Sequence, residues 1–237
     1  MLASLVGDTA GVGERRRRGA GFWVGIGLVL AGLAVLGYVG WQLWGTNWVS
    51  QRKHEQTVGD LQRLFERDEQ PGAQTAQTVR TEHGTASAIV RIPEFGDDYA
   101  VPLLEGIGDP VLAEGFGHFP DSAAPGETGN FALAGHRVTH GEPLRRMPEL
   151  EPGDEVVVET AEATYTYVLT SGGDDLRVTF RDGWVVEPLP RNPQQGGVQP
   201  KQEKGQRLLT LTTCAELFHT DDRLVAFGVL ESVSRRR

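Results

Sequence analysis

The chain reads Arg-Leu-Leu-Thr-Leu-Thr-Thr-Cys over residues 207–214 and Arg-Leu-Val-Ala-Phe-Gly-Val-Leu over residues 223–230. Both stretches are short, rich in apolar and β-branched residues, and bounded by polar or turn-forming residues, which is typical of largely buried β-strands. Cys214 ends the first stretch. A residue at the end of a strand lies where side chains leave the sheet and reach solvent or a cleft.

Runs of the same kind occur earlier in the chain and are separated by turn signals such as Pro152-Gly153-Asp154 and Gly172-Gly173. Several short strands at regular spacing predict an all-β domain, either a closed barrel or a sandwich. Between residues 174 and 205 the chain is rich in Pro, Gly and Gln, which predicts a long irregular loop. The additional predicted strands cover residues 88–92, 99–104, 130–134, 155–160 and 164–170.

An apolar segment covers residues 21–44, and no charge occurs between Arg18 and Arg52. As a helix it would be about 36 Å long, which is enough to cross a hydrocarbon core of about 30 Å. The arginines at 15–18 directly precede it, so the positive-inside rule predicts a cytoplasmic tail over 1–20 and export of the rest. A cleaved signal peptide is the alternative, but the apolar run continues about ten residues past the weak Gly32-x-Ala34 site.

Residues 50–84 are polar, and residues 45–84 are predicted to form an extracellular linker. A short amphipathic helix is predicted over 58–65, and its apolar face holds Val58, Leu61, Leu64 and Phe65. The whole chain has 237 residues, a formal net charge of −9 and one cysteine. An acidic folded part argues against nucleic acid as a partner. A single cysteine excludes an intramolecular disulfide, so the thiol of an exported chain is either incidental or used chemically.

Three side chains are candidates for chemistry: Cys214, His136 and Arg223. His136 follows the predicted strand 130–134 and Gly135, whereas Arg223 opens the predicted strand 223–230. Each also has a purely structural interpretation. Cys214 could be a buried thiol, His136 a hydrogen-bonded structural histidine, and Arg223 a solvated cation at the start of a strand. Among the other histidines, His54 and His83 are expected to be solvated in the linker, and the remaining three lie in turn-like polar stretches: His118, His140 and His219.

Taken together, the three residues can perform acyl transfer without a metal or cofactor. An imidazolium lowers the pKa of a neighbouring thiol and can protonate a leaving amine, and a guanidinium can stabilise an oxyanion. The sequence contains no Cys-x-x-Cys or His-Glu-x-x-His pattern, so no metal site of the usual kind is expected.

The motifs around these residues resemble those of the sortase family. Thr210-Leu211-Thr212-Thr213-Cys214 resembles the Thr-Leu-x-Thr-Cys signature, Arg223-Leu224-Val225 the arginine strand, and Ala134-Gly135-His136-Arg137 the histidine segment. The resemblance covers residues 85–233 and implies a sortase-type eight-stranded β-barrel with short helices, preceded by one N-terminal transmembrane helix. Residues 85–237 would then be the catalytic domain.

The resemblance also implies roles and partners. Cys214 would form a thioester with the threonine of a C-terminal sorting signal, His136 would act as general acid and base, and Arg223 would bind the oxyanion. Thr213 and Ala215 would contact the substrate. The partners would be secreted proteins with a sorting signal and a peptidoglycan precursor amine of the lipid II type.

Within the family the chain looks similar to class E sortases of high-GC Gram-positive bacteria, which read Leu-Ala-x-Thr-Gly rather than Leu-Pro-x-Thr-Gly. It departs from them after the cysteine, where they often carry Pro and this chain has Ala-Glu-Leu-Phe over 215–218. A pilus-polymerising sortase and a non-catalytic, membrane-tethered cell-wall binding domain remain alternatives. The Ser-x-Gly-Cys run of L,D-transpeptidases is absent.

Overall fold

The computed structural model describes residues 19–41, 46–68, 77–214 and 221–236. The arginines at 15–18 and Ala215 lie outside these ranges. The chain forms two compact units, Met1–Gln42 and Leu43–Arg237. In the first unit, helix α1 (Ala20–Gly40) is apolar on all sides, which suits a helix surrounded by lipid. Among the described residues it is the one helix long and apolar enough to span a membrane, over Gly21–Gly40, which lies within the apolar run at 21–44.

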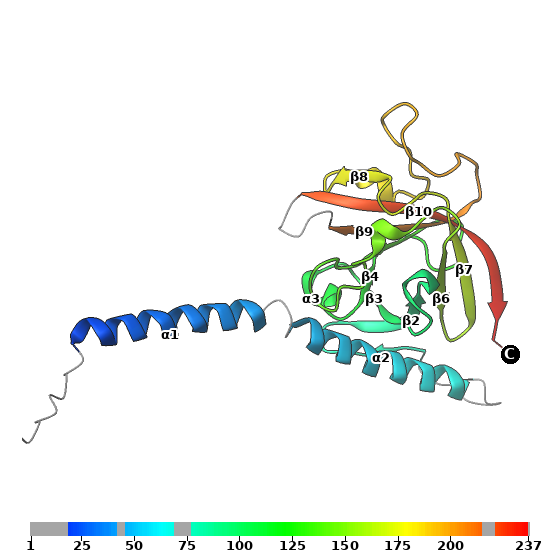
Figure 1. The fold of residues 1–237 in the computed structure, drawn as a ribbon. Coiled ribbons are helices and arrows are strands. Elements are labelled where there is room, and N and C mark those ends of the chain that lie inside the picture. Colours follow the sequence, from blue (N-terminus) through cyan, green and yellow to red (C-terminus); the bar gives the residue numbers. More distant parts are fainter. Residues whose placement is uncertain (1–18, 42–45, 69–76, 215–220, 237) are drawn as a thin grey trace, which may run out of the picture. The chain divides into compact units, whose positions relative to one another are not determined.

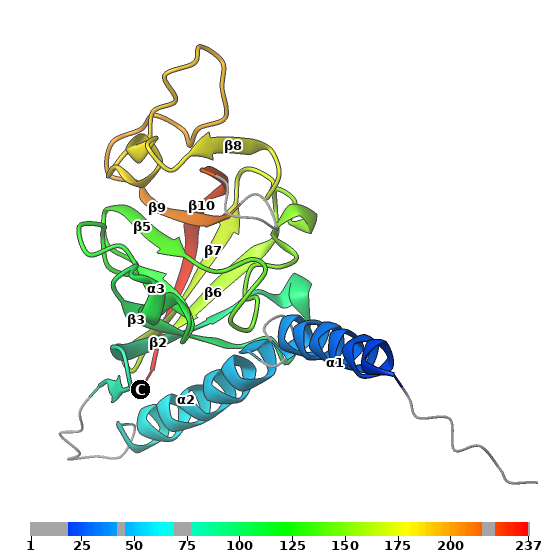
Figure 2. The same cartoon turned by 90° about the vertical axis from the view of Figure 1, so that its left-hand side faces the viewer.

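The second unit is a β-barrel (Figures 1 and 2). Eight strands follow one another in the order β2-β3-β4-β5-β9-β10-β7-β6, and β6 pairs back with β2 to close the ring. β1 pairs with β2 and β8 with β10, outside this ring. The predicted eight-stranded barrel is therefore confirmed. The strands are β1 (Val79–Arg80), β2 (Thr85–Arg91), β3 (Val101–Glu105), β4 (Phe116–His118), β5 (Gly129–Ala134), β6 (Glu155–Glu159), β7 (Ala163–Leu169), β8 (Leu176–Thr179), β9 (Arg207–Cys214) and β10 (Asp222–Arg235).

Each strand predicted from the sequence has a counterpart, and the three missed strands β1, β4 and β8 are the shortest. The segment 174–205 is not wholly irregular, because it contains β8 and the 3-10 turn η4 (Gly183–Val186). The prediction that His118 lies in a polar turn is also wrong: it ends β4 and is buried. Runs of two to four residues carry too little periodicity to stand out from their surroundings.

The two faces of β10 explain where β8 and η4 lie. Leu224 and Ala226 point into the barrel core, and the alternate residues Val225 and Phe227 lie on the opposite face. β8 and η4 cover that second face with Leu176, Val178 and Val185. A strand that is buried on both faces needs apolar residues at every position, as in the continuous run Leu-Val-Ala-Phe.

Helix α2 (Thr46–Asp68) is much longer than the predicted helix over 58–65. The predicted apolar face is correct: Val58, Leu61 and Phe65 are buried against Ile89 and Leu104 of the barrel. α2 therefore packs on the barrel beside β2, opposite the side covered by β8 (Figure 1). One expectation for this segment is wrong, since His54 is 5% exposed rather than solvated.

The remaining short elements are α3 (Asp109–Leu112) and the 3-10 turns η2 (Pro93–Phe95) and η3 (Met147–Glu149).

Candidate active site

The ends of two parallel strands bring together the histidine and cysteine segments. β5 and β9 pair in parallel, with Ala134 opposite Thr212. The backbone N–H of Gly135 continues this pairing and donates to the Thr212 carbonyl at 3.1 Å. Because parallel strands end at the same edge of a sheet, His136, which follows β5, lies at the edge where Cys214 ends β9.

The third predicted residue reaches the same edge from the other side of β9. β10 runs antiparallel to β9, and Arg223 is the direct partner of Cys214 in the register. The backbone positions of the three predicted catalytic residues are therefore neighbours, although His136 and Cys214 are 78 positions apart in the sequence. The side chain of Cys214, like Ala215, lies outside the described part of the structure.

Close packing fixes the backbone just before His136. A Cβ on Gly135 would lie 3.0 Å from a ring carbon of Phe116 and 3.2 Å from Cδ1 of Leu144, so only glycine fits without displacing these side chains. The Gly135 carbonyl accepts a hydrogen bond of 2.7 Å from the hydroxyl of Thr213. The His136 carbonyl accepts another, of 2.9 Å, from the N–H of Leu144.

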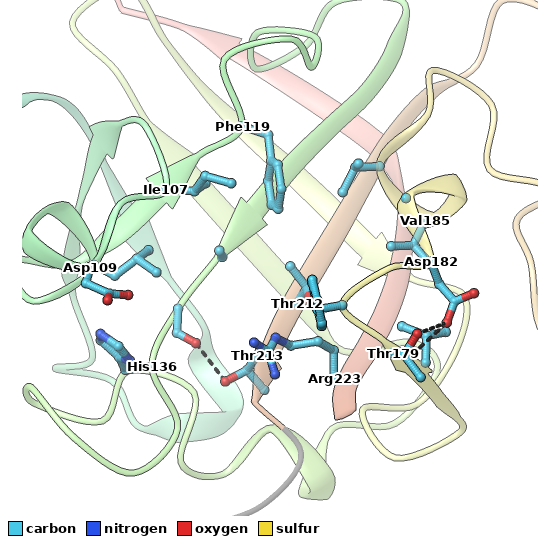
Figure 3. Close-up of a pocket in the computed structure, with 17 residues that line it drawn as sticks. Ile107, Asp109, Phe119, His136, Thr179, Asp182, Val185, Thr212, Thr213 and Arg223 are labelled. Carbon is cyan, nitrogen blue, oxygen red and sulfur yellow. Dashed lines mark hydrogen bonds between the residues drawn. The ribbon is translucent and has the colours of Figure 1, made fainter. Parts of the chain in front are cut away.

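A cavity of about 340 Å³ opens at this edge (Figure 3). In the view of Figure 3, Asp109 and His136 lie on one side of Thr213 and Arg223, and Thr179 and Asp182 lie on the other. The wall is mainly apolar, with contributions from the loop before α3, the end of β4, β8 and η4. The apolar side chains are Ile107, Leu112, Phe119, Ala134, Val178, Phe180, Val185 and Val186.

The sequence motifs predict the polar end of this cavity but not its apolar wall. His136, Thr213 and Arg223 line the cavity, as the motifs suggested. Ile107 and Val185 were not predicted because they lie in segments without periodicity, and only the tertiary fold brings these segments beside the motif strands. No signal in the sequence alone would have singled them out.

A buried polar network holds the η4 wall against the barrel. The side-chain amide of Asn130 donates to the carbonyls of Val185 and Glu187, at 3.1 and 3.0 Å. Its carbonyl oxygen accepts from the hydroxyl of Thr210 at 2.9 Å. Each polar group in this network forms a hydrogen bond. A fully hydrogen-bonded buried network is rigid and favours a single packing arrangement.

Arg223 belongs to the lining of the cavity. Arg223 is partly buried, and its Nη1 donates to the Asp222 carbonyl at 2.9 Å, which restricts the guanidinium.

Away from the cavity, Glu82, His83 and Glu114 bring potential metal-ligand atoms within 4.8 Å of one another. The ammonium of Lys53 already pairs with Glu82 there, at 2.9 Å.

Comparison with known proteins identifies the family. Residues 90–231 match the Sortase domain family. Sortase SrtE1 of Streptomyces coelicolor is 35% identical over 209 residues, a match that spans 84% of this chain but 54% of the relative. The solved structure of sortase E from Streptomyces avermitilis is 36% identical, with a TM-score of 0.56 over 66% of this chain and 93% of that one.

The crystal structure of sortase E1 from Streptomyces coelicolor with a tripeptide in the active site is 33% identical. Its TM-score is 0.54, over 64% of this chain and 91% of that chain. These likenesses agree with the motifs at the edge of the barrel. The chain therefore belongs to the sortase family, and within it resembles the class E members.

Proposed function

We propose that this chain is a membrane-anchored cysteine transpeptidase, with Cys214 as nucleophile, His136 as general acid and base, and Arg223 as the oxyanion-binding cation. The strand register is the observation that carries this proposal. It pairs Cys214 directly with Arg223, and it brings the residue before His136 within hydrogen-bonding distance of the residue before Cys214. A nucleophile, a base and a cation at one edge of a cavity are the groups that acyl transfer requires.

In the first half of the reaction, the thiolate of Cys214 attacks the carbonyl carbon of the substrate threonine. The guanidinium of Arg223 stabilises the negative charge on the carbonyl oxygen. The C–N bond to glycine then breaks, and the imidazolium of His136 gives its proton to the departing amine. The products are a thioester on Cys214, a neutral His136 and a released peptide whose N-terminal residue is glycine.

In the second half, an acceptor amine attacks the thioester carbon. Neutral His136 takes the proton that this amine loses, the C–S bond breaks, and the thiolate is restored. The acceptor that fits a cell-wall enzyme is an amine of a peptidoglycan precursor, of the lipid II type. The donor is a secreted protein that ends in a sorting signal.

The signal we propose is Leu-Ala-x-Thr-Gly, or else Leu-Pro-x-Thr-Gly, cleaved between Thr and Gly. The apolar wall of the cavity supports this proposal, because it suits the small and aliphatic side chains that precede the threonine. The tripeptide in the active site of the related sortase E1 supports a peptide ligand.

We further propose that α1 anchors the chain, with residues 1–20 in the cytoplasm. Residues 45–84, which include α2, and the catalytic domain over 85–237 would lie outside the cell. The arginines at 15–18 support this orientation. Labelling with a membrane-impermeant amine reagent on intact cells should modify Lys201 and Lys204, which follow β8, before the cells are lysed.

Cleavage of a peptide series by the full chain in detergent micelles tests the activity. The series places Ala or Pro at the second position of the signal, and mass spectrometry follows the products. We expect wild-type protein to form a Cys214 thioester and to release a fragment whose N-terminal residue is glycine. Equal cleavage by Cys214→Ala would overturn the proposal. Adding either a glycine-type amine or a lysine side-chain amine as acceptor separates cell-wall anchoring from pilus polymerisation.

A further inference from the structure

The ring of a second histidine lies against that of His136. The ring centroids of His136 and His140 are 4.9 Å apart, and their planes are inclined by 31°. His140 does not belong to the lining of the cavity among the described residues. His136 does line the cavity, so its ring contact with His140 is a route by which His140 can act on substrate chemistry.

The backbone that carries His140 adopts an unusual conformation. Three consecutive residues have left-handed backbone angles: His140 with φ 53°, Gly141 with φ 82° and Glu142 with φ 53°. In the described part of the chain, His140 and Glu142 are the non-glycine residues with positive φ. Such conformations persist only where surrounding contacts impose them, and they gather at functional sites.

Helix α2 supplies those contacts. The side chain of Asn47 accepts a hydrogen bond from the Gly141 N–H at 3.2 Å and donates one to the Glu142 carboxylate at 2.6 Å. One asparagine thus binds both the backbone and a side chain of the left-handed segment. Its two bonds use the carbonyl and amide ends of the same group, so no smaller side chain can replace it.

His54 fills the space beneath the same segment. A Cβ on Gly141 would lie 2.7 Å from Cε1 of His54, so glycine is required there both for its φ and for this contact. His54 is buried, and its Nε2 has no hydrogen-bond partner among the described residues. A buried, unpaired nitrogen destabilises the folded state, which suggests that another requirement has kept it in place.

We propose that His140 is a positioning residue for His136, and that Asn47 and His54 of α2 hold the 140–142 segment in the conformation this requires. The inference rests on the proposed role of His136. It makes α2 part of the catalytic scaffold rather than a spacer. A flat ring beside His136 restricts the imidazole to orientations compatible with both Cys214 and the leaving amine.

The charges around His140 are compatible with a neutral ring. Burial lowers the pKa of His140, and the carboxylate of Asp109 acts in the opposite direction. Burial lowers the pKa of His54 to about 4, a hydrogen bond with the Ala113 backbone opposes this, and His140 lowers it further. With Thr139 hydrogen-bonded to its Nδ1 at 3.0 Å, a neutral His140 can stack on His136 without repelling its charged form.

Paired variants of the full chain in detergent micelles test the positioning role. His140→Asn removes the ring but suits a left-handed backbone, whereas His140→Phe keeps a ring. Asn47→Ala removes the support from α2, and Gln51→Ala is its control because Gln51 is exposed on the same helix. The readouts are the ring resonances of His136 in histidine-labelled protein, the pH profile of Cys214 alkylation by iodoacetamide, and the kcat and KM of peptide cleavage.

We expect His140→Asn and Asn47→Ala to move the His136 resonances, shift the alkylation profile and lower kcat by roughly ten- to hundredfold with KM nearly unchanged. His140→Phe should recover most of kcat, and Gln51→Ala should match wild type. Unchanged resonances and alkylation in His140→Asn would overturn the proposal, even if Asn47→Ala fails to fold. Resonances and alkylation need no substrate, so a wild-type chain that cleaves no peptide would refute the proposed function and leave this test intact.

Discussion

The hydroxyl of Thr213 donates a hydrogen bond of 2.7 Å to the carbonyl of Gly135. Thr213 directly precedes Cys214 and Gly135 directly precedes His136, so this bond joins the two segments that carry the proposed nucleophile and base. Thr213 is 3% exposed. It lines the cavity, but its hydroxyl is already engaged with Gly135, so we expect this group to position the catalytic pair.

Thr213→Val should lower kcat and leave KM nearly unchanged, because valine has the same shape but cannot donate to Gly135. A buried carbonyl left without its donor costs about 1–3 kcal/mol, which should also lower the melting temperature. Thr213→Ser keeps the hydroxyl and should restore most of both losses. A Thr213→Val enzyme with wild-type kcat would contradict a positioning role.

Arg223→Lys should lower kcat by about a hundredfold or more, because removing one oxyanion donor typically has that effect and a point charge does not reproduce the guanidinium fork. Steady-state cleavage of the preferred peptide measures it. The exposed Arg80→Lys serves as a control for the chemical change alone. An undiminished rate in Arg223→Lys would remove Arg223 from the oxyanion site.

Asn130→Ala should raise KM and lower the free energy of unfolding by about 1–3 kcal/mol. It removes the donor to the Glu187 carbonyl, whereas the Thr210 hydroxyl can still donate to the Val185 carbonyl, at 3.1 Å. Denaturant unfolding and peptide KM are the measurements. If KM stays constant while stability falls, the network does not control the η4 wall of the cavity.

Ile107→Ser should raise KM for the sorting peptide by about three- to tenfold, because it removes apolar surface from the cavity wall. Val233→Ser is a matched control, since both residues are 41% exposed but Val233 does not line this cavity. Both variants should unfold within about 0.5 kcal/mol of wild type. Equal KM values for the two variants would place the peptide elsewhere.

The pair His118 and Glu105 should make stability depend on pH. Burial would lower the pKa of His118, but its hydrogen bond to Glu105, at 3.0 Å, and the Glu105 charge outweigh burial and raise it above its ordinary value of 6.5. A raised pKa favours the folded state when histidine is protonated, so the stabilisation is complete below pH 6.5 and disappears as the pH rises through the folded pKa.

Melting temperatures of wild type and Glu105→Gln between pH 5 and pH 9 measure this effect, with the exposed Glu231→Gln as control. The gap between wild type and Glu105→Gln should be largest at about pH 5 and close toward about pH 9. A gap that does not change with pH would mean that the hydrogen bond, not the charge on His118, carries the stabilisation.

The sequence by itself determined the local features of this protein. The apolar run that became α1, the longer strands and the motif positions of His136, Cys214 and Arg223 are all encoded in short windows of hydrophobic pattern and turn residues. Period-2 alternation and apolar length act on neighbouring residues, so they can be recognised without the fold. The spacing of the strands alone is compatible with either a barrel or a sandwich. The family resemblance predicts that eight strands close into a barrel.

The tertiary structure alone decided which segments meet. The parallel pairing of β5 with β9 brings the end of the His136 strand to the edge where Cys214 ends its own, and η4 forms the cavity wall because Asn130 and Thr210 bind its carbonyls. His54 reads as a solvated linker residue, yet α2 buries it beside Gly141. Such contacts join residues about 25 to 90 positions apart. Their free energy depends on complementary shape and on hydrogen bonds that no local pattern records.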